Sequence, residues 1–372
     1  MPTELKKESS DFVITAFLDS LTAHYEDSEL IKETIQGIYH SLKFTVSHFK
    51  NGQGKLIIDK IIDAANYPNI AVREIAMQCI VEVVRLCYDH ISEFMADITE
   101  CTMNASKKDE EEVKTQALEV WSSIAEEENM REEKNIQHFN FIDTAFDVLI
   151  EMIQETIQDI NVGNEELDEE QQWGTSVAAA SCLSLISLVA KDKVVVPITE
   201  FVAEKIRNEN DWKMRYCGIV ALGAILEGPT KKNLQSVLAP AVPMLLDLIN
   251  DHHRRVKYAI YWLFSRLAKT QHELITHQND FPLLFSRMMD GLKGDVRMAA
   301  NVASIIAELA DSMLNRPEKV HSCILSEVFG ELCNELLAFI LNDNIESETD
   351  LSRVRVSGFS ALYNLLQYAP QD

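Results

Sequence analysis

One repeated pattern constrains the fold of this 372-residue chain more than any other. It is an apolar residue followed directly by a basic one, at the start of a segment with helical apolar periodicity. The clearest copy is Met214-Arg215 in the stretch 210–229, which Asp211 can cap and Gly228-Pro229 can end. The other copies are Ile31-Lys32, Val72-Arg73, Val113-Lys114, Val256-Lys257, Val296-Arg297 and Val354-Arg355, with Val177-Ala178 as a degenerate one.

Successive copies follow at intervals of 41, 41, 64, 37, 42, 40 and 58 residues. Two helices in a unit of about 40 residues are typical of HEAT and armadillo repeats, which bury their apolar faces against one another. We therefore predict an all-α, HEAT-repeat superhelical solenoid of about eight helix pairs, forming one array over residues 1–372. The expected units are 8–46, 47–90, 91–130, 140–191, 194–228, 231–270, 276–314 and 317–369. An apolar first helix without a polar capping repeat also leads us to expect a segment of a longer array.

The charge balance indicates which partners suit the chain. Lys and Arg number 34 against 59 Asp and Glu, a formal net charge of -25. Such a surface opposes direct binding to nucleic acid and to anionic membranes, and favours basic partners. The seven cysteines include no CxxC pair and follow no signal peptide, which favours the cytosol or nucleus. No apolar run approaches the roughly 18 residues of a membrane span, so we expect no membrane insertion.

Motifs of catalysis and cofactor binding are missing from the sequence. It contains no glycine-rich phosphate loop, HExxH motif, nucleophile elbow or zinc-type Cys/His spacing. His252 and His253 precede a helix start and are expected to cap it. We therefore expect no enzyme activity, no cofactor and no metal.

Acidic and aromatic residues suggest sites for a basic partner. A carboxylate run closing on Trp173 is too polar to pack, and an indole beside it suits a Lys or Arg side chain. Glu126 to Glu128 are expected at a helix C-terminus, where the macrodipole disfavours them by about 0.3 to 1 kcal/mol; a basic ligand and a solvated helix end both remain open. Trp262 lies off the stripe of Val256, whereas Trp121 and Trp212 are expected to pack. The candidate residues are Glu126, Glu127, Glu128, Glu165, Glu166, Asp168, Glu169, Glu170, Trp173 and Trp262.

Three of these segments also carry a family resemblance. DWKMRYCGIVALGAILEGP, preceded by VWSSIAEEE and by an acidic loop closing on Trp173, resembles the importin β (karyopherin-β) family of nuclear import receptors. The resemblance extends from the ITAFLDSL helix to about residue 310. It implies a superhelix with second helices inside, and a place in the middle of a longer receptor. Leu167 interrupts the loop, and Ser304 stands where the family has a further tryptophan.

The resemblance also implies partners and a location. Importin α or basic cargo signals would bind the inner surface, and the GTPase Ran would contact the acidic loop. Phenylalanine-glycine repeats of nuclear pore proteins would bind outside, and the protein would occupy the cytoplasm, the nucleus and the nuclear envelope at pores. The outer groove would have Ile14, Thr15 and Leu18 on one wall and Ile57 and Ile58 on the other.

Two alternatives stay open at this point. The groove residues can instead join adjacent repeats. A purely structural HEAT-repeat scaffold, resembling a phosphatase regulatory subunit, is the rival function.

Overall fold

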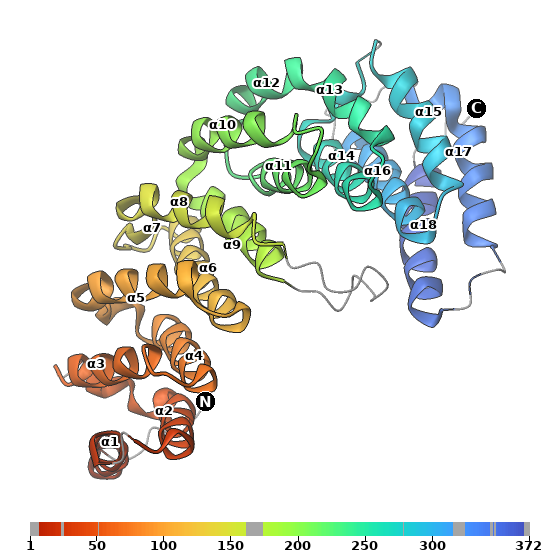
Figure 1. Ribbon diagram of the computed structural model, residues 1–372. Coiled ribbons are helices and arrows are strands. Elements are labelled where there is room, and N and C mark those ends of the chain that lie inside the picture. The colour runs from red at the N-terminus through yellow and green to blue at the C-terminus, as the bar shows by residue number, and fades with distance from the viewer. Residues whose placement is uncertain are drawn as a thin grey trace. The chain divides into compact units, whose positions relative to one another are not determined.

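The computed structural model describes residues 7–367 except 24–25, 51, 161–173, 278, 315–323, 343–344 and 346. Within them every regular element is a helix, and the chain divides into two compact units, Met1–Ala190 and Lys191–Asp372 (Figure 1). The predicted all-α HEAT-repeat fold of about eight helix pairs is confirmed. None of the described helices is long and apolar enough to cross a membrane.

The described residues of the first unit form four helix pairs, one of them with a short extra helix. Its helices are α1 (Lys7–Ala23), α2 (Ser28–Lys50), α3 (Gly54–Ala65), α4 (Ile70–Cys87), α5 (Met95–Lys108), α6 (Glu111–Glu133), α7 (Phe141–Thr144), α8 (Phe146–Thr156) and α9 (Thr175–Ala190). The second helices α2, α4, α6 and α9 pack one on the next, and the first helices α1, α3, α5 and α8 form a second row. Two parallel rows bury the faces that a single pair would leave exposed.

The second unit repeats this arrangement. Its helices are α10 (Val195–Lys205), α11 (Trp212–Ala224), α12 (Lys231–Leu238), α13 (Val242–Asp247), α14 (Arg254–Ile275), α15 (Phe281–Leu292), α16 (Val296–Leu314), α17 (Ile324–Ile340) and α18 (Glu348–Gln367). Here α11, α14, α16 and α18 form the row of second helices. Short 3₁₀ turns join several of these elements.

The repeated apolar-basic pairs lie where second helices begin. Val72, Val113 and Val256 each fall in a first turn and are fully buried. Val354 is also fully buried but lies one turn further into α18, so that copy is displaced from the helix start. In these four copies the apolar member therefore anchors the second helix in its row, whereas Met214 and Val296 are only half-buried.

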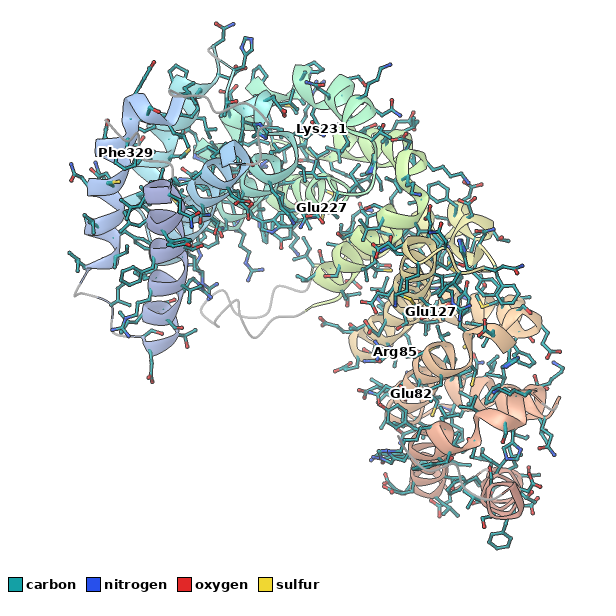
Figure 2. The ribbon with its side chains drawn as sticks, turned by 180° about the vertical axis from the view of Figure 1, so that it is seen from behind. Glu82, Arg85, Glu127, Glu227, Lys231 and Phe329 are labelled. Carbon is teal, nitrogen blue, oxygen red and sulfur yellow. The ribbon has the colours of Figure 1, made fainter. Side chains whose placement is uncertain are left out.

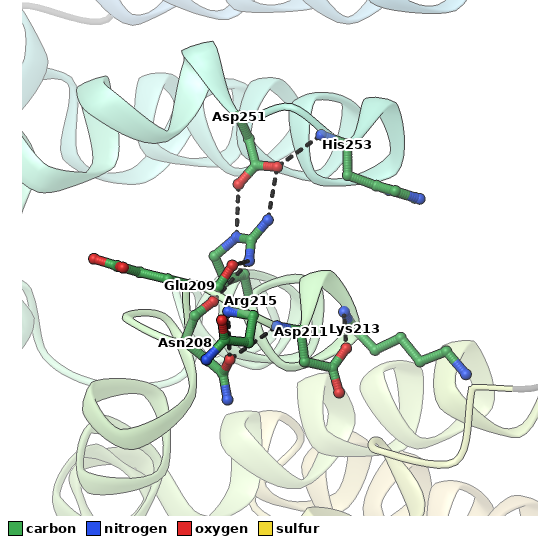
Figure 3. A network of polar contacts seen from close by, with 8 residues as sticks. Asn208, Glu209, Asp211, Lys213, Arg215, Asp251 and His253 are labelled. Atoms are coloured by element: carbon green, nitrogen blue, oxygen red, sulfur yellow. Dashed lines mark hydrogen bonds and ion pairs between the residues drawn. The ribbon is translucent and has the colours of Figure 1, made fainter.

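In three of the copies the basic member reaches forward to the next repeat. The Nε and Nη2 atoms of Arg215 bond the carboxylate of Asp251 at 2.6 and 2.9 Å (Figure 3). Its Nη1 atom donates to the carbonyl oxygens of Asn208 and Glu209, in the turn that precedes α11. One side chain thus fixes the start of its own helix and the turn before the next.

The same contact recurs in the first unit. Arg73 bonds Asp109 through Nε and Nη2 and donates to the carbonyl of Tyr67, and Lys114 pairs with Asp159 at 2.6 Å. Burial alone would raise the pKa of Asp251, but hydrogen bonds from Arg215 and the backbone of His253 outweigh it and lower that pKa. The ion pair therefore holds the charged carboxylate at the repeat junction.

The structure corrects our prediction for the template helix. The helix α11 ends at Ala224, before Gly228, and Cys217 to Ala224 are buried on every side instead of along one stripe. After Arg215 the helix contains no charged residue, so neighbouring helices can cover it on all sides. Trp121 is buried as predicted, with its indole N–H donating to the Thr102 hydroxyl at 3.0 Å.

Candidate functional site

The predicted acidic loop lies outside the described residues. Its candidate members are Glu165, Glu166, Asp168, Glu169, Glu170 and Trp173. Their role in binding stays a prediction. The candidate surface described below is formed by the remaining predicted residues and by their neighbours on the second helices.

The reasoning about Glu126 to Glu128 placed them wrongly at a helix end. The helix α6 continues to Glu133, so the macrodipole argument does not apply to them. Glu126 is exposed, while Glu127 pairs with Arg131 at 2.6 Å. Only the first of the three therefore offers a free carboxylate to a partner.

Glu128 is fully buried and has a structural role. It accepts hydrogen bonds from the hydroxyl of Tyr88 at 2.9 Å and from the backbone N–H groups of Phe141 and Ile142 at 2.5 and 3.2 Å. Burial raises the pKa of this carboxyl, and the three donors partly oppose that effect. Glu128 thus caps the start of α7 and is withdrawn from the surface that we predicted for it.

Trp262 is half-buried, in agreement with its predicted position off the core stripe. Its ring packs on Gly223, where an added Cβ would come within 2.2 Å of the ring. The guanidinium of Arg266 lies 5.4 Å from the ring centre, and its Nε donates to the Gly223 carbonyl at 2.8 Å. A cation from the chain itself therefore already lies at the ring of Trp262.

Carboxylates lie near Arg266 and Lys269, which are on the same helix as Trp262. Glu227 lies 2.9 Å from the Nζ of Lys269 and 3.5 Å from the Nη2 of Arg266. On α16, burial raises the pKa of Glu308; Lys269 opposes this, and the charges of Asp311 and Glu227 add to it. The surface beside Trp262 thus combines acidic and basic groups.

A more acidic surface follows α4 and α6 in the first unit. Figure 2 shows Glu82, Arg85 and Glu127 along one side of these helices. Arg85 pairs with Glu119 at 2.5 Å, while within the described ranges neither Glu82 nor Glu126 has an ion-pair partner. Sequence reasoning missed Glu82 and Glu119 because each is a single acidic residue within a helical pattern.

The structure also changes our prediction of which residues line the outer groove. Ile57 and Ile58 are fully buried and Ile14 is 4% exposed, so these residues join adjacent helices. The assignment of Ile57 and Ile58 to an open wall needs correction, since a fully buried side chain presents no surface to an aromatic ring. Thr15 is exposed and Leu18 half-buried on α1.

The exposed apolar side chain of α3 is Leu56, at 52%. A groove between α1 and α3 would therefore have to use Leu56, together with Thr15 and Leu18. Phenylalanine-glycine binding there stays a prediction. Among the described residues, no group of three His, Cys, Asp or Glu side chains is placed to hold a metal ion.

Comparisons with known proteins give one consistent relationship. No family model matches the chain. Importin subunit beta-1 of Arabidopsis thaliana is 25% identical over 387 residues, covering 100% of this chain and 43% of the relative. Importin subunit beta-1 of Saccharomyces cerevisiae is 23% identical over 371 residues, covering 97% and 41%.

Solved structures agree with these relatives on the fold. Yeast importin-beta (Kap95p) superposes with a TM-score of 0.88 and 22% identity, covering 98% of this chain and 42% of that one. A complex of Kap95 with Nup1 gives a TM-score of 0.87, and one of Kap95p with RanGDP gives 0.85, both at 22% identity and the same coverage. The chain thus spans about two fifths of the length of the proteins it matches. It is similar, along its whole length, to one part of importin subunit beta-1, and it has the HEAT-repeat fold of importin β.

Proposed function

We propose that this chain serves in a nuclear transport receptor of the importin β type, as the part that binds basic protein segments. The whole-length similarity to importin subunit beta-1 from two organisms supports this function. The proposed activity is recognition without catalysis. The basic segment would be an import signal or the adaptor importin α.

The observation that carries the proposal is the acidic side of α4 and α6. Glu82 and Glu126 have no ion-pair partner in the described part of the chain, and the chain as a whole carries a net charge of -25. Glu82 is half-buried and Glu126 is exposed. Carboxylates that water can reach repel one another, and a basic segment relieves that repulsion. Because exposed charges are screened over about 8 Å at physiological ionic strength, such binding weakens as salt rises.

Two further partners belong to the same proposal. Kap95, which this chain resembles in fold, is known in complex with Nup1, and another structure concerns Kap95p with RanGDP. We extend both kinds of partner to this chain, with pore proteins at the first-helix row and Ran near the acidic loop. Such a receptor would act in the cytoplasm, in the nucleus and at pores.

The test is a titration of a labelled Lys- and Arg-rich import-signal peptide at several salt concentrations. We expect the double variant Glu82→Gln, Glu126→Gln to bind the peptide several-fold more weakly. Its salt dependence should also be flatter, because two contacts between a carboxylate and a basic side chain of the peptide are lost. Neutralising the five carboxylates from Glu165 to Glu170 should have a larger effect of the same kind.

A matched control separates a local site from overall charge. Glu151→Gln with Glu155→Gln on α8 makes the same charge change on a first helix, where both residues pair with Lys107. The control should bind almost as the wild type does. Equal weakening in the control would mean that only net charge matters, and absence of peptide binding by the wild type at low salt would reject the proposed function.

A further inference from the structure

Exposed apolar side chains line one side of α18, a member of the second-helix row. Val356, Phe359, Tyr363 and Leu366 have exposed fractions of 71%, 54%, 62% and 57%. Their spacing of three, four and three residues places them along one side of a helix that has about 3.6 residues per turn. We call these four side chains the α18 stripe.

The α18 stripe faces away from the helices that α18 packs against. Val354, Ala361 and Leu365 are buried on the other side of the helix. An added Cβ at Gly358 would come within 2.6 Å of Ile340, so α17 lies close to that position. The stripe is therefore not part of the core that α18 shares with its neighbours.

The preceding member of the row is covered on two sides by second helices. In α16, Asn301 and Ser312 donate hydrogen bonds to carbonyl oxygens of α14, whereas the carbonyl oxygen of Ala307 accepts from Asn364 of α18. Figure 1 shows α14, α16 and α18 side by side. Among the described helices, α18 has a second-helix neighbour on one side only. The α18 stripe thus offers a side on which another helix of this kind can pack.

The charge of α18 suits contact between two copies of this chain. From Leu351 to Gln367 the helix contains no Asp or Glu, although the chain carries 59 of them. A net charge of -25 opposes the approach of two copies, so a contact forms most readily where carboxylates are missing. The α18 stripe lies within such a segment.

The spacing of the stripe reads the same in both directions. In an antiparallel pair of α18 helices centred on position 361, Val356 lies opposite Leu366 of the second copy, and Phe359 lies opposite Tyr363. Such a two-fold contact uses the same patch on both copies and brings two Phe–Tyr pairs together at its centre. A helix of an unrelated protein would need this same apolar spacing, which a second copy already has. We propose that two copies of the chain associate through the α18 stripe in an antiparallel contact.

The area of the stripe indicates a weak dimer. An aromatic side chain has about 150 to 250 Å² of surface, and Phe359 and Tyr363 expose a little more than half of theirs. With Val356 and Leu366 the stripe presents roughly 400 Å², within the range of about 300 to 600 Å² for the largest apolar patch of a monomer. Two copies would bury about twice that area, which is typical of weak complexes. We therefore expect a dissociation constant in the micromolar range.

Sedimentation velocity of the full chain measures this association. At concentrations from about 1 to 100 µM, which bracket a micromolar dissociation constant, the wild type should shift from 42.2 kDa toward twice that mass. Phe359→Glu places a carboxylate against an aromatic ring and should weaken the dimer by at least about tenfold. Because this side chain is exposed, the melting temperature of the dilute variant should equal that of the dilute wild type.

Val196→Glu provides the matched control. Val196 lies on α10, outside the stripe, and is 62% exposed. The dissociation constant of this variant should stay within about twofold of wild type, as expected for a distant charge. Equal weakening by both substitutions, or a wild type that stays monomeric at every concentration, would overturn the proposal.

A mixture of two variants tests the antiparallel register. Phe359→Glu and Tyr363→Lys each disrupt both central Phe–Tyr pairs when the variant pairs with itself. When the two variants pair with each other in the antiparallel contact, one Phe–Tyr pair is intact and the introduced carboxylate meets the introduced ammonium. The mixture should therefore dimerise more tightly than either variant alone. A mixture that dimerises no more tightly contradicts the antiparallel contact.

Salt separates this inference from the proposed function, on which it does not depend. Added NaCl screens the repulsion between two copies that each carry a net charge of -25, so the dimer should tighten as salt rises. Binding of a basic peptide should weaken over the same range. A dimer that dissociates in added salt would mean that ion pairs hold the copies together, and the assignment to the apolar α18 stripe would be wrong.

Discussion

At the scale of single residues, the buried carboxyl of Glu128 provides a test of stability against pH. Its pKa is raised above the ordinary 4.5, chiefly by burial, so the folded protein binds this proton more tightly than the unfolded chain does. The group therefore favours folding at low pH, and this contribution is lost as pH rises through the folded-state pKa. Glu128→Gln removes the titration.

The measurement is urea denaturation of wild type and variant over a pH series beginning below 4.5. We expect the free energy of unfolding of wild type, relative to Glu128→Gln, to fall as pH rises from that value. Glu126→Gln, an exposed change on the same helix, is the control and should show no such trend. A constant difference for Glu128→Gln would contradict the pKa direction.

The same residue marks a limit of sequence reasoning. Glu126, Glu127 and Glu128 look equivalent in the sequence, and a charged run predicts a solvated face. What separates them is distant: the donors to Glu128 come from Tyr88 and from backbone groups 13 and 14 residues ahead. No local pattern contains that information, so the buried member of the run could not be identified from the sequence.

At the scale of elements, the ion pairs between repeats should stabilise each unit locally. Arg215→Met leaves Asp251 without its bidentate partner, and the side chains are only 12% and 6% exposed. We expect a loss of about 2 kcal/mol, less than the roughly 3 to 5 kcal/mol for a fully buried pair, because both side chains keep some contact with solvent. Arg73→Met is the matching change at Asp109 in the first unit, where the exposures are 18% and 11%.

Hydrogen exchange shows where each loss falls. Because contacts in a repeat array are made between neighbours, Arg215→Met should speed exchange in α11 and α14, and Arg73→Met in α4 and α6. Each variant serves as the control for the other. Equal acceleration throughout both units would show that the whole chain unfolds as one cooperative block.

Most helix starts could be predicted from the sequence, whereas several helix ends and buried faces could not. Starts depend on local signals such as Asp211, which accepts from the N–H of Lys213 as expected. The helix ends at Ala224 and Glu133 do not follow from local stop signals. Packing against other helices decides which apolar residues of α3 are buried. Ile57 and Leu56 are adjacent in sequence, yet one is fully buried and the other 52% exposed.

At the scale of the whole molecule, a net charge of -25 should make added salt act in opposite directions on the stability of the fold and on its affinity for a basic peptide. Self-repulsion among exposed carboxylates destabilises the compact state, and salt screens it. The inter-repeat pairs Arg73–Asp109 and Arg215–Asp251 are largely shielded from solvent, so salt weakens them less. Raising NaCl from about 20 to 300 mM, a change of the Debye length from roughly 20 to 6 Å, should therefore raise the melting temperature by several degrees.

Calorimetry over that range measures the effect, and the basic-peptide affinity of the same samples should decrease. Sucrose, which stabilises proteins without screening charge, is the control: it should raise the melting temperature and leave the peptide affinity nearly unchanged. A melting temperature that falls with NaCl would mean that attractive ion pairs outweigh the repulsion between carboxylates. The surplus negative charge would then be balanced within the fold, and the physical reason for a basic partner would be lost.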